Sequence, residues 1–117
     1  MEILAVTPNK NANEILFKFK WNNGNPAWIE LKNEKLVFVA PKYTGKYWDY
    51  TPTGYNPSAS IVKAILRLFT HQAIPFMRKI IEDLEKKQGD WLTIQNYKLA
   101  IEKIKNLSWS DENEKAC

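Results

Sequence analysis

The stretch that decides the fold is "EILFKFKW", residues 14–21. Its odd-numbered positions are Ile, Phe, Phe and Trp, and Lys18 and Lys20 stand between them. A period of two is typical of a β-strand with one buried and one solvated face. The sequence therefore predicts a sheet whose solvated face carries these two lysines.

Short connections on either side of this strand predict an antiparallel meander. The "NNGN" at 22–25 tolerates the positive φ of a tight turn, "PAWIELK" at 26–32 gives the next strand, and 33–34 turn the chain into "KLVFVA" at 35–40. With a short leading strand near residues 2–6, we expect about four strands. Connections this short exclude a helical crossover.

Beyond this region the apolar period becomes helical. The segment "NPSASIVKAILRLF" at 56–69 opens with capping residues, Pro75 is expected to kink or break the helix just before it, and Gly89 is a plausible stop. A last helix is expected from the cap Asp90, with Trp91 in the core. Its apolar stripe is Ile94, Tyr97, Ile101 and Ile104.

Strands followed by helices predict one α+β domain, with two to three C-terminal helices packed on one face of an N-terminal antiparallel meander. The chain has 117 residues, 44% hydrophobic and 26% charged, which suits a single folded domain. We expect this domain at 1–107, followed by a flexible, mildly acidic tail at 108–117. This tail contains Trp109 and resembles in composition a short acidic peptide that another protein could bind.

The aromatic stretch "PKYTGKYWDYTPTGYNPS", residues 41–58, reads as a long loop with five rings, two glycines and three prolines. Long loops often carry binding residues. Aromatic rings beside lysines are typical of sites that bind single-stranded nucleic acid, where the rings stack on bases and the amines neutralise phosphates. The opposite interpretation is that several rings fold back to cover the sheet or the helix ends.

Charge supports an anionic partner. The net charge is +4, and the first 81 residues hold 11 Lys and Arg against 5 Asp and Glu. The predicted nucleic-acid-binding residues are Lys18, Lys20, Lys42 and Lys46 for phosphates, and Tyr43, Tyr47, Trp48 and Tyr50 for bases. Further positive charge comes from the predicted helices, at Lys63, Arg67, Arg78 and Lys79.

The sequence contains no recognisable catalytic constellation, so we expect a non-enzymatic protein without metal or cofactor. His71 is the single histidine, Cys117 is the single cysteine, and no Walker or Rossmann phosphate loop is present. One cysteine allows no internal disulfide, which is typical of a reducing compartment. With no basic leader and no long apolar run, we expect no membrane association and a cytoplasmic location, in the host cytoplasm if the protein is viral.

The leading hypothesis is therefore a non-enzymatic binder of single-stranded DNA or RNA, acting through a basic, aromatic-rich sheet face and the 41–57 loop. The strand-then-helix order is similar to that of small sheet-based single-strand binders such as the Whirly proteins, in architecture only. The alternative is a small virus- or mobile-element-encoded protein-interaction module, for example an inhibitor, that docks its aromatic loop on a host protein. The stripe of the last helix can also support a homodimer.

Overall fold

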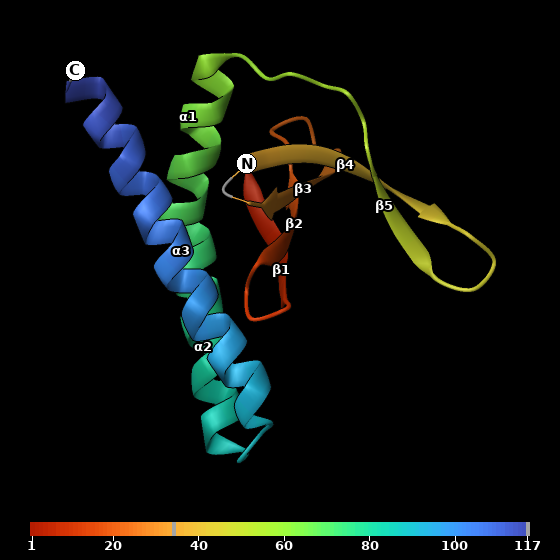
Figure 1. Cartoon of the computed structure of the whole chain (residues 1–117), viewed down its shortest axis with the longest axis vertical. Coiled ribbons are helices and arrows are strands. Elements are labelled where there is room, and N and C mark those ends of the chain that lie inside the picture. Colours follow the sequence, from red (N-terminus) through yellow and green to blue (C-terminus); the bar gives the residue numbers. More distant parts are fainter. Residues whose placement is uncertain (34, 117) are drawn as a thin grey trace.

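The computed structural model describes the backbone of residues 1–33 and 35–116 and the side chains of residues 1–33 and 35–107. The elements are β1 (Glu2–Asn9), β2 (Glu14–Lys20), β3 (Pro26–Lys32), β4 (Lys35–Tyr43), β5 (Trp48–Pro52), α1 (Ala59–Leu68), η1 (Phe69–Ala73), α2 (Ile74–Lys86) and α3 (Trp91–Ala116). The five strands form one antiparallel sheet in chain order, and the helices follow (Figure 1). The predicted α+β class, with its N-terminal meander, is confirmed.

The sheet has a fifth strand, β5, within the aromatic stretch that was expected to be a loop. The ladder between β3 and β4 ends at Trp28 and Val39. Two residues further the same register would set Pro26 opposite Pro41, and neither proline has an N–H to donate. From there β4 pairs with β5 alone, so the two strands leave the sheet as a projecting ribbon (Figure 1).

The helical half is a hairpin of two long helical segments that covers one face of the sheet (Figure 1). The first segment begins where Ser58 accepts a hydrogen bond from the Ile61 N–H at 3.4 Å, as the capping prediction required. Before Pro75 the α-helix gives way to the π-helical turn η1. The predicted interruption is present, but the chain continues in the same direction into α2 instead of breaking.

The turn between α2 and α3 stops the first segment near Gly89, as predicted. The left-handed residue is Gln88, at φ +53°, and the Gly89 N–H donates to Leu84 O at 2.7 Å. A Cβ on Gly89 would lie 2.9 Å from Leu84 Cδ2 and 3.2 Å from Leu84 O, so a larger residue would require Leu84 to shift; glycine is favoured by this close approach and not by a positive φ.

The start of α3 corrects one prediction. Asp90 caps the helix, accepting from Thr93 Oγ1 at 2.9 Å. Trp91 was expected in the core but is 68% exposed, and Leu92 is 61% exposed. Helical spacing does place Trp91 on the apolar stripe, three residues before Ile94. That part of the stripe lies at the α2–α3 turn, beyond the elements that bury the rest of it.

The core lies between the sheet and the helices. Phe17 stacks on Phe69 of η1 with ring centroids 4.1 Å apart, and both rings are fully buried. Ile94, Ile101 and Ile104 of α3 are buried in the same core. The stripe is thus used within the chain, and a homodimer would need a different surface.

The connection between β1 and β2 is held in an unusual backbone conformation. Lys10, Asn11 and Ala12 follow one another at φ values of +51°, +56° and +63°, a region that non-glycine residues rarely adopt. Ala12 is only 1% exposed and belongs to the core. Burial of its methyl group offsets part of the cost of this conformation.

The predicted flexible tail at 108–117, with Trp109, lies outside the residues whose side chains are described, and it stays a prediction. Within the described residues, no helix is both long and apolar enough to cross a membrane.

Candidate nucleic-acid interface

The sheet face opposite the helices carries the predicted strand lysines. Lys18 stands opposite Trp28 of β3 in the ladder, and its Nζ lies 5.6 Å from the centre of the Trp28 ring. Strand alternation places both side chains away from the buried Phe17 and Ile29. A lysine above an aromatic ring is a cation–π contact, so the expected basic face with an aromatic on it is present.

The lysines of this outer face differ in whether an acidic side chain neutralises them. Glu14 lies 3.2 Å from Lys10 Nζ and 3.5 Å from Lys32 Nζ. The hydrogen bond from Lys10, assisted by Lys32, lowers the pKa of Glu14 and keeps it ionised. Lys32 is therefore partly neutralised at its end of the sheet. At the other end of β2, Lys20 is exposed and has no ion-pair partner among the described residues.

The ribbon of β4 and β5 presents two rings side by side. Tyr43 and Trp48 are directly opposite in the ladder, with ring centroids 5.3 Å apart. They are 57% and 59% exposed. Alternation places the opposed pair Pro41 and Tyr50, two residues further along each strand, on the same side of the ribbon. Exposed large rings gathered in this way are a candidate for an interaction surface.

The turn at the tip of the ribbon is stabilised by hydrogen bonds within the turn, to the side chain of Thr44. Gly45 takes φ +96°, and Thr44 accepts at its Oγ1 from the Tyr47 N–H at 3.2 Å. This turn leaves Lys46 exposed and Tyr47 63% exposed. The tip therefore offers one ring and one amine to a partner.

At the base of the ribbon, one aromatic ring folds back over the sheet, as the alternative interpretation of residues 41–58 predicted. Tyr55 packs edge-on against Phe38, with centroids 4.9 Å apart, and Trp21 stacks on Phe38 at 6.0 Å. Thr53 ties the end of β5 to β4 through its N–H and Oγ1, which both donate to Phe38 O. One ring of the aromatic stretch thus covers the core, while the rings further out stay exposed.

The structure brings together five of the eight predicted binding residues and separates the others. The outer face holds Lys18, Lys20, Tyr43, Trp48 and Tyr50. Lys46 and Tyr47 lie at the tip. Lys42 stands opposite Asp49 on the reverse side of the ribbon, because it alternates with Tyr43.

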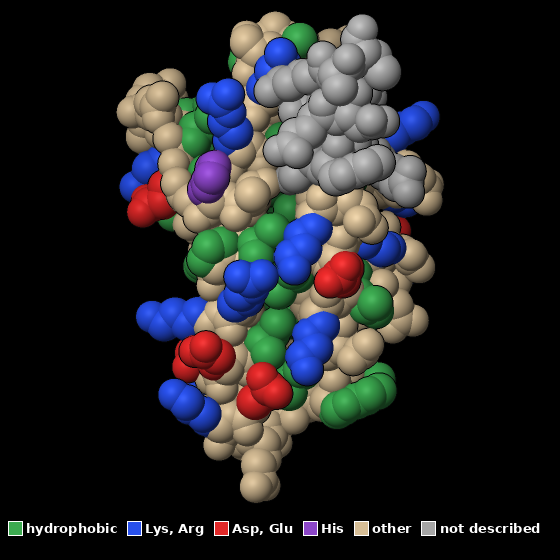
Figure 2. Space-filling view, turned by 90° about the vertical axis from the view of Figure 1, so that its left-hand side faces the viewer, with side chains coloured by type: hydrophobic (Ala, Val, Ile, Leu, Met, Phe, Trp, Pro, Cys, Tyr) green, Lys and Arg blue, Asp and Glu red, His purple; other side chains and the backbone are tan. Residues whose placement is uncertain are grey.

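The basic residues of the helices do not join this face. Lys63, Arg67, Arg78 and Lys79 are exposed, but they belong to the helices that cover the other side of the sheet. On that side, shown in Figure 2, Lys and Arg are interspersed with Asp and Glu. Trp28 was not among the predicted binding residues. The period of two in "PAWIELK" is the signal that places it beside Lys18.

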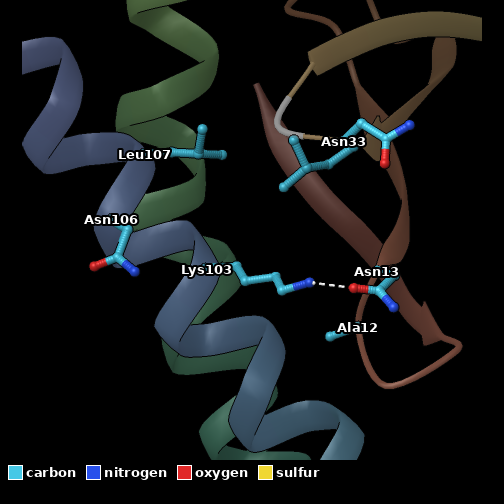
Figure 3. A pocket seen from close by; sticks show the side chains of 7 residues that line it. Ala12, Asn13, Asn33, Lys103, Asn106 and Leu107 are labelled. Atoms are coloured by element: carbon cyan, nitrogen blue, oxygen red, sulfur yellow. Dashed lines mark hydrogen bonds between the residues drawn. The ribbon is translucent and has the colours of Figure 1, made fainter.

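A cavity of about 380 Å³ lies elsewhere, between α3 and two turns of the sheet. In Figure 3, Lys103 reaches from α3 to Asn13, and its Nζ donates to Asn13 Oδ1 at 2.9 Å. The other lining residues are Ala12, Leu31, Asn33, Asn106 and Leu107. We assign no ligand to this cavity.

Comparison with known proteins gives no match: no family model, no curated protein and no solved structure is similar to this chain. Within the described residues there is also no group of three or more His, Cys, Asp or Glu side chains that could hold a metal ion.

Proposed function

We propose that this protein binds single-stranded nucleic acid, DNA or RNA, across the outer face of its sheet. The observation that carries the proposal is the Lys18 amine held over Trp28, on the same face as the exposed pair Tyr43 and Trp48. Amines and ring faces on one surface supply both contacts that such a ligand needs.

The two kinds of contact have separate roles. Lys18 and Lys20 on β2 neutralise phosphates, and the rings on β4 and β5 stack on bases. The rings lie on the same face as the lysines but beyond the end of the β3–β4 ladder, where the ribbon leaves the sheet. A strand crossing the sheet from β2 to the ribbon meets both in turn. Lys46 and Tyr47 extend the same path to the tip.

Single strands are preferred because bases in a duplex are already stacked on each other and cannot offer their faces to Tyr43 and Trp48. Each stacked base contributes about 1–3 kcal/mol and tolerates any sequence. The proposed binding is therefore sequence-tolerant, and a duplex of the same length binds more weakly.

The test is a fluorescence-anisotropy titration of labelled oligo-dT, a mixed RNA oligomer and a duplex at several salt concentrations. Trp48→Ala is expected to weaken single-strand binding by about 1–3 kcal/mol. Lys20→Ala is expected to reduce the slope of log K against log salt by about 0.7, the value for one phosphate contact on a single strand. Binding of wild-type protein that does not respond to salt would refute the proposal.

Two variants on the far side serve as matched controls. Trp91 is a tryptophan at the start of α3 that is more exposed than Trp48, and Lys79 is an exposed lysine of α2. Trp91→Ala and Lys79→Ala are expected to leave affinity and salt slope unchanged. If they weaken binding as much as the variants of the outer face, the contact is general attraction to a basic protein.

A second candidate is a protein-interaction module that docks the ribbon on a host protein, as expected of a small viral or mobile-element factor. It is favoured by the exposure of Tyr47, which lies at the tip, away from the strand lysines. Here Trp48→Ala is expected to cost about 2 kcal/mol or more in partner binding. Lys18→Ala and Lys20→Ala would then have little effect, which separates the two candidates.

A further inference from the structure

The two edges of the sheet differ in how their backbone groups are satisfied. At β1, the Gln72 side chain accepts from the Ile3 N–H at 2.9 Å and donates to Met1 O at 3.1 Å. The Tyr97 hydroxyl donates to Val6 O at 3.2 Å. Helical side chains thus take the place of a neighbouring strand, and this edge is closed to further pairing.

The edge at β5 is open, and its unpaired groups can be identified from the ladder. Thr44 N donates to Tyr47 O and Thr53 N donates to Phe38 O, both at 2.9 Å. Hydrogen-bonded and non-bonded pairs alternate along an antiparallel ladder. The opposed pairs Tyr43/Trp48, Pro41/Tyr50 and Val39/Pro52 are therefore the non-bonded ones.

Residues at non-bonded positions direct their N–H and C=O groups away from the partner strand. Trp48 and Tyr50 each turn a donor and an acceptor to the outer edge of β5, and Pro52 turns an acceptor. None of these groups is hydrogen-bonded to another part of the described chain. Both prolines of the ribbon sit where the β4–β5 ladder needs no donor.

We propose that β5 pairs antiparallel with β5 of a second copy of this chain, with the two-fold axis at Tyr50. Among the symmetric registers that place outward-facing groups opposite each other, those with the axis at Asp49 or at Tyr50 form the most backbone hydrogen bonds within β5. With the axis at Asp49, that carboxylate directly faces its own copy, and like charges opposite each other destabilise a sheet. With the axis at Tyr50, Asp49 faces Thr51 of the second copy.

The two registers form equal numbers of backbone hydrogen bonds, because Pro52 accepts from Trp48 of the second copy but cannot donate in return. Charge therefore selects the register with Tyr50 on the axis. In it Trp48 also lies beside Pro52 of the second copy, on the outer face. Since the β1 edge is closed, pairing stops at two copies and does not extend into a filament.

The dimer joins the two outer faces into one continuous surface. It would lengthen the proposed nucleic-acid path, but the pairing does not depend on that function. Because β5 has only five residues, we expect a weak dimer whose population rises with concentration.

Sedimentation of the full chain without nucleic acid, over about three orders of magnitude in concentration, tests the dimer. The wild-type protein is expected to change from monomer to dimer. Tyr50→Pro removes an N–H that the β4 ladder does not use, and it is expected to raise the dimer dissociation constant at least about tenfold. Tyr50→Val removes the ring but keeps the N–H, and it is expected to dimerise.

Disulfide cross-linking tests the register without requiring that the proline variant fold. In a Cys117→Ser background, Tyr50→Cys is expected to form an interchain disulfide under mild oxidation, because a hydrogen-bonded pair has Cα atoms about 5.5 Å apart. Thr51→Cys keeps the Asp49 carboxylate and is the register control; position 51 faces position 49 of the second copy and not its own copy, so it should cross-link more slowly. A wild-type monomer at every concentration, or faster cross-linking at position 51, would overturn the proposal.

Discussion

β1 and β5 are the outermost strands of the same sheet, but they meet their surroundings in opposite ways. β1 lies against the helices, where Gln72 and Tyr97 satisfy its edge and Ile3 and Val6 are buried. β5 belongs to a two-stranded ribbon that projects from the body, with Trp48 59% exposed and an unpaired edge (Figure 1).

We expect this difference to separate the residues that stabilise the fold from those of the proposed binding surface. The helices cover β1, so its side chains contribute buried apolar area and satisfied hydrogen bonds. The ribbon is attached at its base by Phe38, Tyr55 and Thr53, and its outer rings contact each other instead of the core. A two-stranded ribbon by itself is marginally stable in water, so the ribbon depends on the body for its form. Changes near the helices should therefore affect folding, and changes in the ribbon should affect binding.

The largest effect is expected from Phe17→Ala. Phe17 is fully buried and stacked on Phe69, so its removal leaves a cavity at the contact between sheet and helices. We expect a loss of about 3–5 kcal/mol in the free energy of unfolding, measured by urea denaturation. A loss below about 1 kcal/mol would mean that this contact does not hold the two layers together.

A smaller loss is expected from Gln72→Leu, which keeps the approximate size of the side chain. It leaves the Ile3 N–H and the Met1 carbonyl without their partner at a partly buried edge, at a cost of about 1–3 kcal/mol. His71→Leu changes the exposed neighbouring residue and serves as the control. Equal effects of the two variants in urea denaturation would contradict the closure of β1 by Gln72.

Tyr97→Phe removes one hydrogen bond to Val6 O and should cost about 0.5–1.5 kcal/mol at neutral pH. Burial raises the pKa of Tyr97, so the fold favours the neutral phenol. Its contribution to stability is present below the ordinary tyrosine pKa of about 10 and is lost as pH rises through the raised folded-state pKa. The stability difference between wild type and Tyr97→Phe should therefore shrink in strong alkali. If the stability difference between wild type and Tyr97→Phe does not change in strong alkali, the fold does not favour the neutral form of the Tyr97 hydroxyl.

The smallest effect on stability is expected from Trp48→Ala, at less than about 1 kcal/mol, the range of a single cross-strand pair. The same variant is expected to give the large loss of binding described above. Urea denaturation alongside the binding titration tests both expectations. If Trp48→Ala destabilises the protein as much as Phe17→Ala does, the ribbon is part of the core and the contrast between β1 and β5 fails.

Local patterns in the sequence determined much of the architecture. The period of two in residues 14–21, the caps at Ser58 and Asp90 and the interruption before Pro75 each depend on residues close in the chain. Those features specify backbone conformation directly, so strand order, helix order and the α+β class followed from them. The same alternation put Lys18 on the solvated face, and the structure brings Trp28 against it.

Tertiary structure decided the features that depend on what lies opposite a residue. β5 was missed because the prolines of the aromatic stretch read as loop, but Pro41 of β4 and Pro52 of β5 are tolerated in the ladder because both fall at non-bonded positions. Trp91 has the spacing of a core residue but lies where no element covers it. Lys42 and Tyr43 are neighbours in the sequence, but the ribbon sends them to opposite sides. The burial of a side chain and the hydrogen bonding of a sheet edge depend on contacts between segments that are distant in the sequence. A short stretch of sequence therefore does not predict them.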